Sequence, residues 1–167
     1  MQVPVAHIFV KKHVKGEKFG TRGSISQEDW DSIEMILERH NVKTLLEFGA
    51  GFSTKKFCDA GLEVISLETN ATWARIVAGE CPDAKVIVWD NENFPKEEVG
   101  NGKFDLVFVD GVDPRERQVI FGREFSDRLL MHDTKRRQEQ ELIQKYLSSW
   151  DATKLSDGRL TLLERVS

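Results

Sequence analysis

Residues 45–54 read LLEFGAGFST, an apolar run that passes through an acidic residue into a glycine-rich turn. The apolar run predicts a short strand that is buried on both faces of a parallel sheet. Gly49 and Gly51 permit backbone conformations and a close ligand approach that a Cβ would hinder, and Ser53 or Thr54 can cap a helix that starts there. A strand, a tight glycine turn and a helix N-terminus together predict a nucleotide-sized site at the carboxyl edge of the sheet.

A second apolar run, residues 62–67, leads into the acidic residue Glu68. A carboxylate at the end of the strand that follows the glycine turn can accept hydrogen bonds from both hydroxyls of a ribose. The pattern Glu-x-Gly-x-Gly over residues 47–51, followed by a strand that ends in Glu, resembles the cofactor-binding half of class I S-adenosylmethionine-dependent methyltransferases. The run TNATW at residues 69–73 is similar to the same family, in which an aromatic residue often follows the ribose-binding acid.

This resemblance implies that the cofactor is S-adenosylmethionine. It also implies a set of cofactor-binding residues at the glycine turn and at the strand ends: Glu47, Gly49, Ala50, Gly51, Ser53, Thr54, Glu68, Asn70, Asp90 and Asp110. Asp90 has two interpretations. An acid or amide near this point meets the adenine amino group in the family, whereas an Asp that leaves a strand into Asn-Glu-Asn is often a turn former.

Length and composition limit what else the chain contains. With 167 residues we expect one domain, residues 1–167, with an N-terminal arm or lid over residues 1–25 and a core over residues 26–167. The net charge of -4 argues against general nucleic-acid binding, which needs a basic surface. No apolar stretch reaches the roughly 20 residues of a membrane span, and the N-terminal charges follow the apolar patch, unlike those of a secretory signal. Cys58 and Cys81 lack metal-type spacing, so we expect reduced thiols and a cytoplasmic protein.

Apolar periodicity predicts an α/β fold with a doubly wound, mostly parallel sheet and a C-terminal antiparallel hairpin. Ser26 and Asp29 have capping-box spacing, so we expect a first helix there, with an apolar face that carries Trp30, Ile33, Ile36 and Leu37. The predicted strands are 42–48, 62–67, 84–89, 104–109 and 127–132, the predicted helices are 53–60, 71–80, 114–124 and 135–149, and the hairpin strands are 152–155 and 160–165.

Two connections are informative. The turn of the hairpin is expected at Asp157-Gly158, because Gly supplies a positive φ cheaply. The connection over residues 91–103 is short and polar, so the helix between the third and fourth strands is expected to be reduced or missing.

Two more acids follow apolar strands. Asp110 ends the run 104–109, and in the expected strand order it lies beside the glycine turn, near the reactive sulfonium of the cofactor. Asp105 begins the same strand, so we expect it at the opposite edge of the sheet in a structural role. Asp133 follows the next strand, 127–132, and adjacent strand ends bring Asp110 and Asp133 close together.

The spacing of these acids resembles catechol-type O-methyltransferases, in which an Asp after the fourth strand and an Asp-Asn pair after the fifth hold magnesium. The resemblance implies Asp110, Asp133 and Thr134 as ligands of Mg²⁺, with Thr134 in the place of the Asn. Methyl transfer to oxygen needs a deprotonated acceptor, which a metal or a base such as His132 supplies.

We therefore assign Asp110 and His132 to orientation or general-base roles, and Asp133 to metal binding or to pairing with His132. The alternative is that Asp110 caps the next helix and His132 packs against the sheet. The basic residues after these strand ends have two interpretations: they form a cationic rim for an anionic acceptor, or they belong to solvated helix faces. They are Arg115, Arg117, Arg123 and residues 135–137, and Arg115 lies nearest to the strand end.

The predicted function is S-adenosylmethionine-dependent methyl transfer to a small-molecule acceptor, with O-methylation favoured. A noncatalytic S-adenosylmethionine-binding module or subunit is an alternative; it would keep the cofactor site and lack a shielded acceptor pocket. An NAD-dependent oxidoreductase would use the same glycine turn and Glu68. Its fingerprint has a third glycine where this chain has Thr54, and the chain has no room for a substrate domain.

Overall fold

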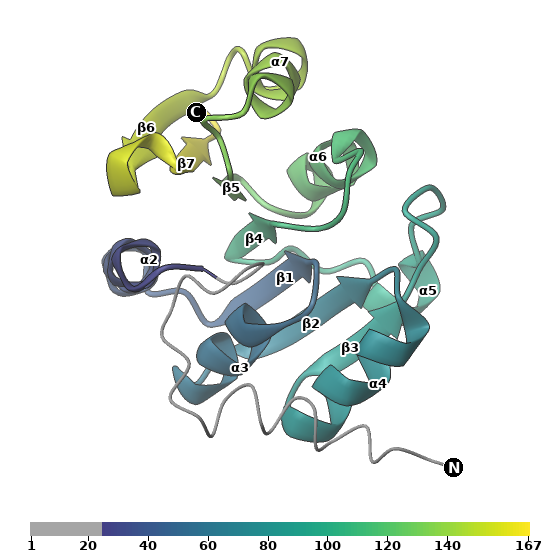
Figure 1. Cartoon of the computed structure of the whole chain (residues 1–167). Coiled ribbons are helices and arrows are strands. Elements are labelled where there is room, and N and C mark those ends of the chain that lie inside the picture. Colours follow the sequence, from purple (N-terminus) through teal and green to yellow (C-terminus); the bar gives the residue numbers. More distant parts are fainter. Residues whose placement is uncertain (1–24) are drawn as a thin grey trace.

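A seven-stranded sheet forms the centre of the protein (Figure 1). The computed structural model describes residues 25–167, so residues 1–24 of the expected N-terminal arm lie outside it. The strands follow the order β3-β2-β1-β4-β5-β7-β6. Their bounds are β1 (Thr44–Phe48), β2 (Glu63–Glu68), β3 (Lys85–Val88), β4 (Leu106–Val109), β5 (Arg128–His132), β6 (Asp151–Leu155) and β7 (Leu160–Glu164).

The pairing of the strands confirms the predicted fold class. Strands β1 to β5 pair in parallel, and β7 pairs antiparallel with both β5 and β6. The predicted C-terminal antiparallel hairpin is present, and it pairs with the sheet at β5. The order of the strands reverses at β1, because β2 lies on one side of it and β4 on the other. Open α/β sheets bind ligands at such a point.

Helices cover both faces of the sheet, and α3 and α4 lie in front of β1–β3 in Figure 1. One core packs α2 and α3 against the sheet, and a second core packs α6 and α7 against its other face. Alternate residues of β1 serve the two cores, because successive side chains of a strand point to opposite faces: Leu45 belongs to the first, Leu46 to the second. The helices are α2 (Gln27–Arg39), α3 (Phe52–Asp59), α4 (Ala71–Glu80), α5 (Lys96–Val99), α6 (Glu116–Phe125) and α7 (Arg137–Tyr146).

The first helix begins as predicted. Ser26 Oγ accepts a hydrogen bond from the backbone N–H of Asp29 at 3.0 Å, and Asp29 Oδ2 accepts one from the backbone N–H of Ser26 at 2.9 Å. These two bonds are the reciprocal capping box, which satisfies two of the otherwise unpaired donors at a helix start. The predicted apolar face is buried at all four positions.

Most boundaries differ from the sequence-based expectation by one or two residues, and three differences have a visible structural reason or consequence. The predicted helix 135–149 is shorter, because Leu147 already leaves the helical conformation and Trp150 packs into the second core. The predicted helix 114–124 begins only at Glu116. The hairpin turn is a short 3₁₀ segment, η1 (Ser156–Gly158), in which Ser156 and Asp157 also have positive φ, so the left-handed backbone extends beyond Gly158.

Other expectations are met in detail. The connection over residues 91–103 contains only the one-turn helix α5. Asp105 lies at the amino edge of β4, where its Oδ2 accepts hydrogen bonds from the backbone N–H groups of Lys43 and Thr44. Both cysteines are free thiols. Within residues 25–167, no helix has the length and apolar character needed to cross a membrane.

Candidate functional site

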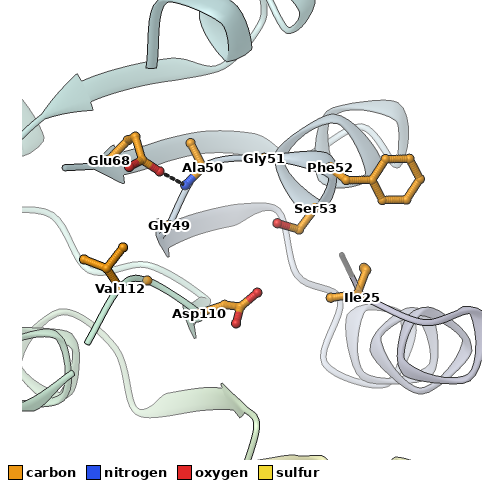
Figure 2. A pocket seen from close by; sticks show the side chains of 10 residues that line it. Ile25, Gly49, Ala50, Gly51, Phe52, Ser53, Glu68, Asp110 and Val112 are labelled. Atoms are coloured by element: carbon orange, nitrogen blue, oxygen red, sulfur yellow. Dashed lines mark hydrogen bonds between the residues drawn. The ribbon is translucent and has the colours of Figure 1, made fainter. Parts of the chain in front are cut away.

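A hollow of about 160 Å³ lies at the carboxyl ends of β1, β2 and β4 (Figure 2). Phe48, the last residue of β1, pairs with Leu67 of β2 on one side and with Val109 of β4 on the other. The three strands therefore end at the same level, and the residues that follow them surround one space. The lining residues are Ile25, Gly49, Ala50, Gly51, Phe52, Ser53, Glu68, Asp110, Gly111 and Val112.

Gly49 is required by the geometry of the turn. Its φ is +94°, and a Cβ at this position would lie 2.5 Å from the backbone oxygen of Asp110 and 2.7 Å from Cα of Gly111. The missing side chain lets the end of β1 come close to the end of β4. Gly51 differs from this expectation, because its φ of 171° is ordinary extended backbone and a Cβ there would meet nothing closer than 3.9 Å.

Glu68 lies on the other side of the turn from Asp110, and Figure 2 shows its bond to Ala50. Its Oε2 accepts a hydrogen bond from the backbone N–H of Ala50 at 3.1 Å, and its Oε1 accepts one from the backbone N–H of Asn70 at 2.8 Å. Oε1 also accepts a long hydrogen bond from the hydroxyl of Thr69 at 3.4 Å. A carboxylate offers about four lone-pair sites, so Oε2 keeps capacity for a ligand hydroxyl, and Oε1 does so when the long bond from Thr69 is released. Glu68 thus combines two tasks: it fixes the glycine turn and lines the hollow.

Trp73 fixes the same turn from α4. Its indole Nε1–H donates to the backbone oxygen of Ala50 at 2.7 Å, and its ring edge lies near Gly51. Asn70, which the resemblance implies as a cofactor contact, caps α4 through a bond from the backbone N–H of Trp73 to its Oδ1 at 2.9 Å.

Glu47 lies behind the turn and does not line the hollow. Its side chain is fully buried, and its carboxyl oxygens accept hydrogen bonds from the hydroxyls of Ser53, Thr54 at 2.6 Å and Ser66 at 2.8 Å. Burial raises the pKa of Glu47 to about 7, against the opposing effect of the three hydroxyl donors. The structure therefore places Glu47 as an anchor that joins β1, α3 and β2, with no face toward a ligand.

The start of α3 corrects the expected cap. The helix begins at Phe52, so the N-cap residue is Gly51, and neither Ser53 nor Thr54 occupies that position. Thr54 Oγ1 accepts a hydrogen bond from the backbone N–H of Gly51 at 2.9 Å, which closes the turn from inside the helix. Ser53 lines the hollow, whereas Thr54 is completely buried.

Asp90 has the contacts of a turn former. Its carboxylate accepts hydrogen bonds from the backbone N–H groups of Glu92 at 2.8 Å and Asn93 at 2.7 Å, and from the Asn93 side chain at 2.7 Å. The bonds from Asn93 and Glu92 lower the pKa of Asp90 to about 2. Asp90 is exposed and is not among the residues that line the hollow, so its observed contacts match the second of the two interpretations.

Asp110 and His132 are brought together at the ends of β4 and β5. Nδ1 of His132 lies 3.1 Å from Oδ1 of Asp110 and 3.4 Å from Oδ1 of Asp133, while its Nε2 lies 3.1 Å from Oδ2 of Asp29 on α2. Burial opposes a charge on the imidazole, but the carboxylates of Asp110 and Asp133 outweigh it and raise the pKa of His132 to about 10. With carboxylates at both ring nitrogens, we expect an imidazolium at neutral pH. It donates from both nitrogens and has no lone pair for a general base.

Arg115 joins the same group of charges. Its Nη2 lies 3.2 Å from Oδ1 of Asp110 and 3.0 Å from Oδ2 of Asp133, and the side chain is only 5% exposed. The hydrogen bond to His132, and then the charge of Arg115, lower the pKa of Asp133 to about 2. Asp29, His132, Asp110, Arg115 and Asp133 alternate in sign, and we call these five residues the charge cluster.

The residues implied for Mg²⁺ do not fit a divalent ion as they stand. Asp110, His132 and Asp133 offer atoms within 4.8 Å of one another, which is the spacing of a ligand set. Arg115 already pairs with both carboxylates, and both nitrogens of His132 face carboxylates. The hydroxyl of Thr134 bonds to the backbone oxygen of Gly158 at 2.9 Å and to Thr161 at 2.8 Å, away from the two acids.

Sequence reasoning missed two participants of the site. Asp29 was visible only as a capping residue, although it also binds Ser156, Arg159 and His132. Gln118 on α6 is 1% exposed, and it accepts from the N–H of Gly111 at 3.2 Å and donates to the backbone oxygen of Val112 at 2.9 Å. Its polar side chain on a buried helix face was the available signal.

Comparisons with solved structures agree with this architecture. A Staphylococcus aureus protein provisionally described as a caffeoyl-CoA O-methyltransferase aligns with a TM-score of 0.71 and 15% identity, over 99% of this chain and 93% of that one. An O-methyltransferase from Bacillus cereus in complex with SAH aligns with a TM-score of 0.67 and 12% identity, over 99% and 92% of the two chains. The chain has the fold of class I S-adenosylmethionine-dependent methyltransferases.

A further structure with this fold is the SAH-bound methyltransferase PaMTH1 from Podospora anserina, with a TM-score of 0.65 and 16% identity, over 99% and 87% of the two chains. At identities of 12% to 16% the similarity is one of fold. No protein-family model and no curated protein sequence matches the chain.

Proposed function

We propose that this protein transfers a methyl group from S-adenosylmethionine to a small-molecule acceptor, with an oxygen as the favoured acceptor atom. The observation that supports this most directly is the hollow at the carboxyl edge, in which the Gly49 turn stands between Glu68 and Asp110. The turn and Glu68 are the features that the cofactor-binding half of this fold uses, and structures with the same fold hold SAH.

In this proposal the side of the hollow at Glu68 and the glycine turn binds the cofactor, and methyl transfer takes place on the side at Asp110. We call them the cofactor side and the transfer side. Glu68 receives the ribose hydroxyls, and the backbone of the glycine turn lies against the cofactor. When bound, S-adenosylmethionine supplies an electrophilic methyl group on a sulfonium. Asp110 lies at the other side of the turn, where Figure 2 shows its carboxylate on the side of Ser53 and Ile25.

The contacts within the charge cluster support narrower roles for these residues than the sequence suggests. Asp110 orients the acceptor by accepting a hydrogen bond, since among residues 25–167 its side-chain hydrogen bonds all fall on Oδ1. His132, as an imidazolium, orients Asp110 instead of removing a proton. Asp133 is the partner of His132 and Arg115. Alignment of acceptor and methyl group is the main contribution that such a displacement needs from a protein.

A noncatalytic S-adenosylmethionine-binding subunit is the second candidate. One observation favours it: the ionisable groups nearest the transfer side pair with each other, so among residues 25–167 no side chain there is a neutral imidazole base. The cofactor side of the hollow is the same in both candidates.

Two measurements test the proposal in sequence. Calorimetry with S-adenosylmethionine, SAH and NAD⁺ on the full chain should give binding of the first two and none of the third. Tight NAD⁺ binding with no response to S-adenosylmethionine contradicts the proposal. Release of SAH is then followed with panels of phenols, carboxylic acids and amines. Acceptor-dependent SAH release supports the enzyme, whereas binding with no turnover on any panel favours the subunit.

A further inference from the structure

Arg115 lies where the two acidic strand ends meet. Its Nη2 contacts Asp110 at 3.2 Å and Asp133 at 3.0 Å, so one nitrogen bridges the carboxylates that follow β4 and β5. A cation that bridges two carboxylates at adjacent strand ends does what a divalent ion does in a metal site. Arg115 differs from an ion in being covalently part of the chain.

The guanidinium is fixed by further bonds. Its Nε donates to the backbone oxygen of Gly111 at 2.8 Å, and its Nη1 donates to the backbone oxygen of His132 at 2.9 Å. Only 5% of the side chain is exposed. A displaced Arg115 would leave a buried carbonyl and two carboxylates without these donors, and each such loss is costly. The surrounding acceptors therefore hold the Arg115 side chain in this one position.

Thr134, the third ligand that the resemblance implies, does not offer its hydroxyl to an ion between the two acids. Divalent cations such as Mg²⁺ and Ca²⁺ take six or more oxygen ligands. The hydroxyl of Thr134 is engaged with Gly158 and Thr161. An ion between Asp110 and Asp133 would have to displace Arg115, and it would then lie beside the displaced charge.

We infer that Arg115 is a built-in cation that holds Asp110 and Asp133 in place of a divalent metal, and that the site binds no divalent ion while Arg115 is present. The geometry of Asp110 is then independent of the metal concentration. This inference goes beyond the proposed function, because it concerns the ionic make-up of the site and holds for an enzyme and for a noncatalytic subunit alike.

The test uses Mn²⁺ alone as the probe. The chelator-treated full chain is titrated with Mn²⁺ by electron paramagnetic resonance, and the wild type should show no stoichiometric site at millimolar Mn²⁺. Arg115→Met removes the charge and leaves two facing carboxylates, so it should gain one Mn²⁺ site that binds at least about tenfold more tightly than the wild type binds the ion. Arg117→Met is the matched control, since Arg117 is exposed in the first turn of α6, two residues after Arg115, and it should behave as the wild type.

Two results overturn the inference. One is a stoichiometric Mn²⁺ site in the wild type that Asp133→Asn abolishes. The other is a folded Arg115→Met protein that gains no site. If Arg115→Met does not fold, the melting temperature of the wild type with added Mn²⁺ still tests the inference. An unchanged melting temperature supports it, and a stabilisation by Mn²⁺ that Asp133→Asn removes contradicts it. The readout involves neither cofactor nor turnover, so its failure is distinct from a failure of the proposed function.

Discussion

Nε2 of His132 lies 3.1 Å from Oδ2 of Asp29, although 103 residues separate the two in the chain. Asp29 belongs to the first turn of α2 and His132 is the last residue of β5. The pair therefore fastens the first described helix to the strand end that borders the site. Asp110 meets the other nitrogen of the ring, so a single imidazolium joins α2 to β4 and β5.

The first prediction concerns the pH dependence of stability. The pKa of His132 is raised from 6.5 to about 10, so the folded state holds this proton more tightly than the unfolded chain. Its stabilisation is complete below about pH 6.5 and is lost as the pH rises toward 10. The unfolding free energy of the wild type minus that of His132→Gln should fall by about 2 kcal/mol across this range, as a buried charged hydrogen bond suggests.

Urea denaturation at several pH values measures this difference. His40→Gln is the control, because burial lowers the pKa of His40. The difference in unfolding free energy between the wild type and His40→Gln should not fall as the pH rises. A difference between wild type and His132→Gln that stays flat from neutral to alkaline pH would mean that the ring is neutral in the folded protein.

The second prediction compares the two glycines of the turn. Gly49→Ala places a Cβ within 2.5 Å of a backbone oxygen at a φ of +94°, and neither atom can move without shifting a strand end. We expect a loss of about 3 kcal/mol or more in unfolding free energy. Gly51→Ala is the matched control and should cost less than about 1 kcal/mol, since its surroundings are open. Equal destabilisation by both variants would contradict the conclusion that the turn requires glycine at position 49 but not at position 51.

The third prediction concerns the cofactor. Glu68→Ala should weaken S-adenosylmethionine binding by about 2 to 3 kcal/mol, roughly 30- to 150-fold, because two hydroxyls lose a charged acceptor. Glu68→Gln keeps one acceptor oxygen for the turn and should bind with intermediate affinity. Calorimetry gives both values, and Glu63→Ala at the exposed start of β2 serves as the control. Unchanged affinity in Glu68→Ala would place the ribose elsewhere.

The fourth prediction concerns Glu47. Burial raises its pKa from 4.5 to about 7, so the folded state retains a proton that the unfolded chain releases above about pH 4.5. The contribution of Glu47 to stability should therefore decline as the pH rises from 4.5 to 7, by about 3 kcal/mol relative to Glu47→Gln.

Asp105→Asn is an informative counterpart. The pKa of Asp105 is lowered, so the contribution of Asp105 should grow as the pH rises through its titration, and denaturation curves with the same sign for both residues would contradict these assignments.

The fold was predictable from local patterns, because buried strands, acidic strand ends and the capping box at Ser26 are all visible within a few residues. The orientation of the acids was not. Glu47 and Glu68 both belong to strand ends at the glycine turn, yet one carboxyl faces three hydroxyls behind the turn and the other lines the hollow. That difference depends on which neighbours pack on each face, and those neighbours come from other elements.

The role of His132 could not be predicted for the same reason. A histidine after a strand reads equally well as a base or as a packing residue. Its raised pKa depends on Asp133 beside it and on Asp110, which is 22 positions away and is brought to the ring only by the fold. Arg115 was noticed because it lies near a strand end, but only the fold shows that it contacts both Asp110 and Asp133.

The turn Ser156–Gly158 joins α2 to the C-terminal hairpin. The hydroxyl of Ser156 and the guanidinium of Arg159 both donate to Oδ1 of Asp29, across 127 and 130 residues of chain. Contacts of such separation carry a large loop-closure entropy and form late unless other contacts hold their ends together. The contacts within the charge cluster among Asp110, Arg115 and His132 span only 5 to 22 residues. We therefore expect the bonds from Ser156 and Arg159 to Asp29 to form after those shorter-range contacts, so that α2 is fastened to the site late in folding.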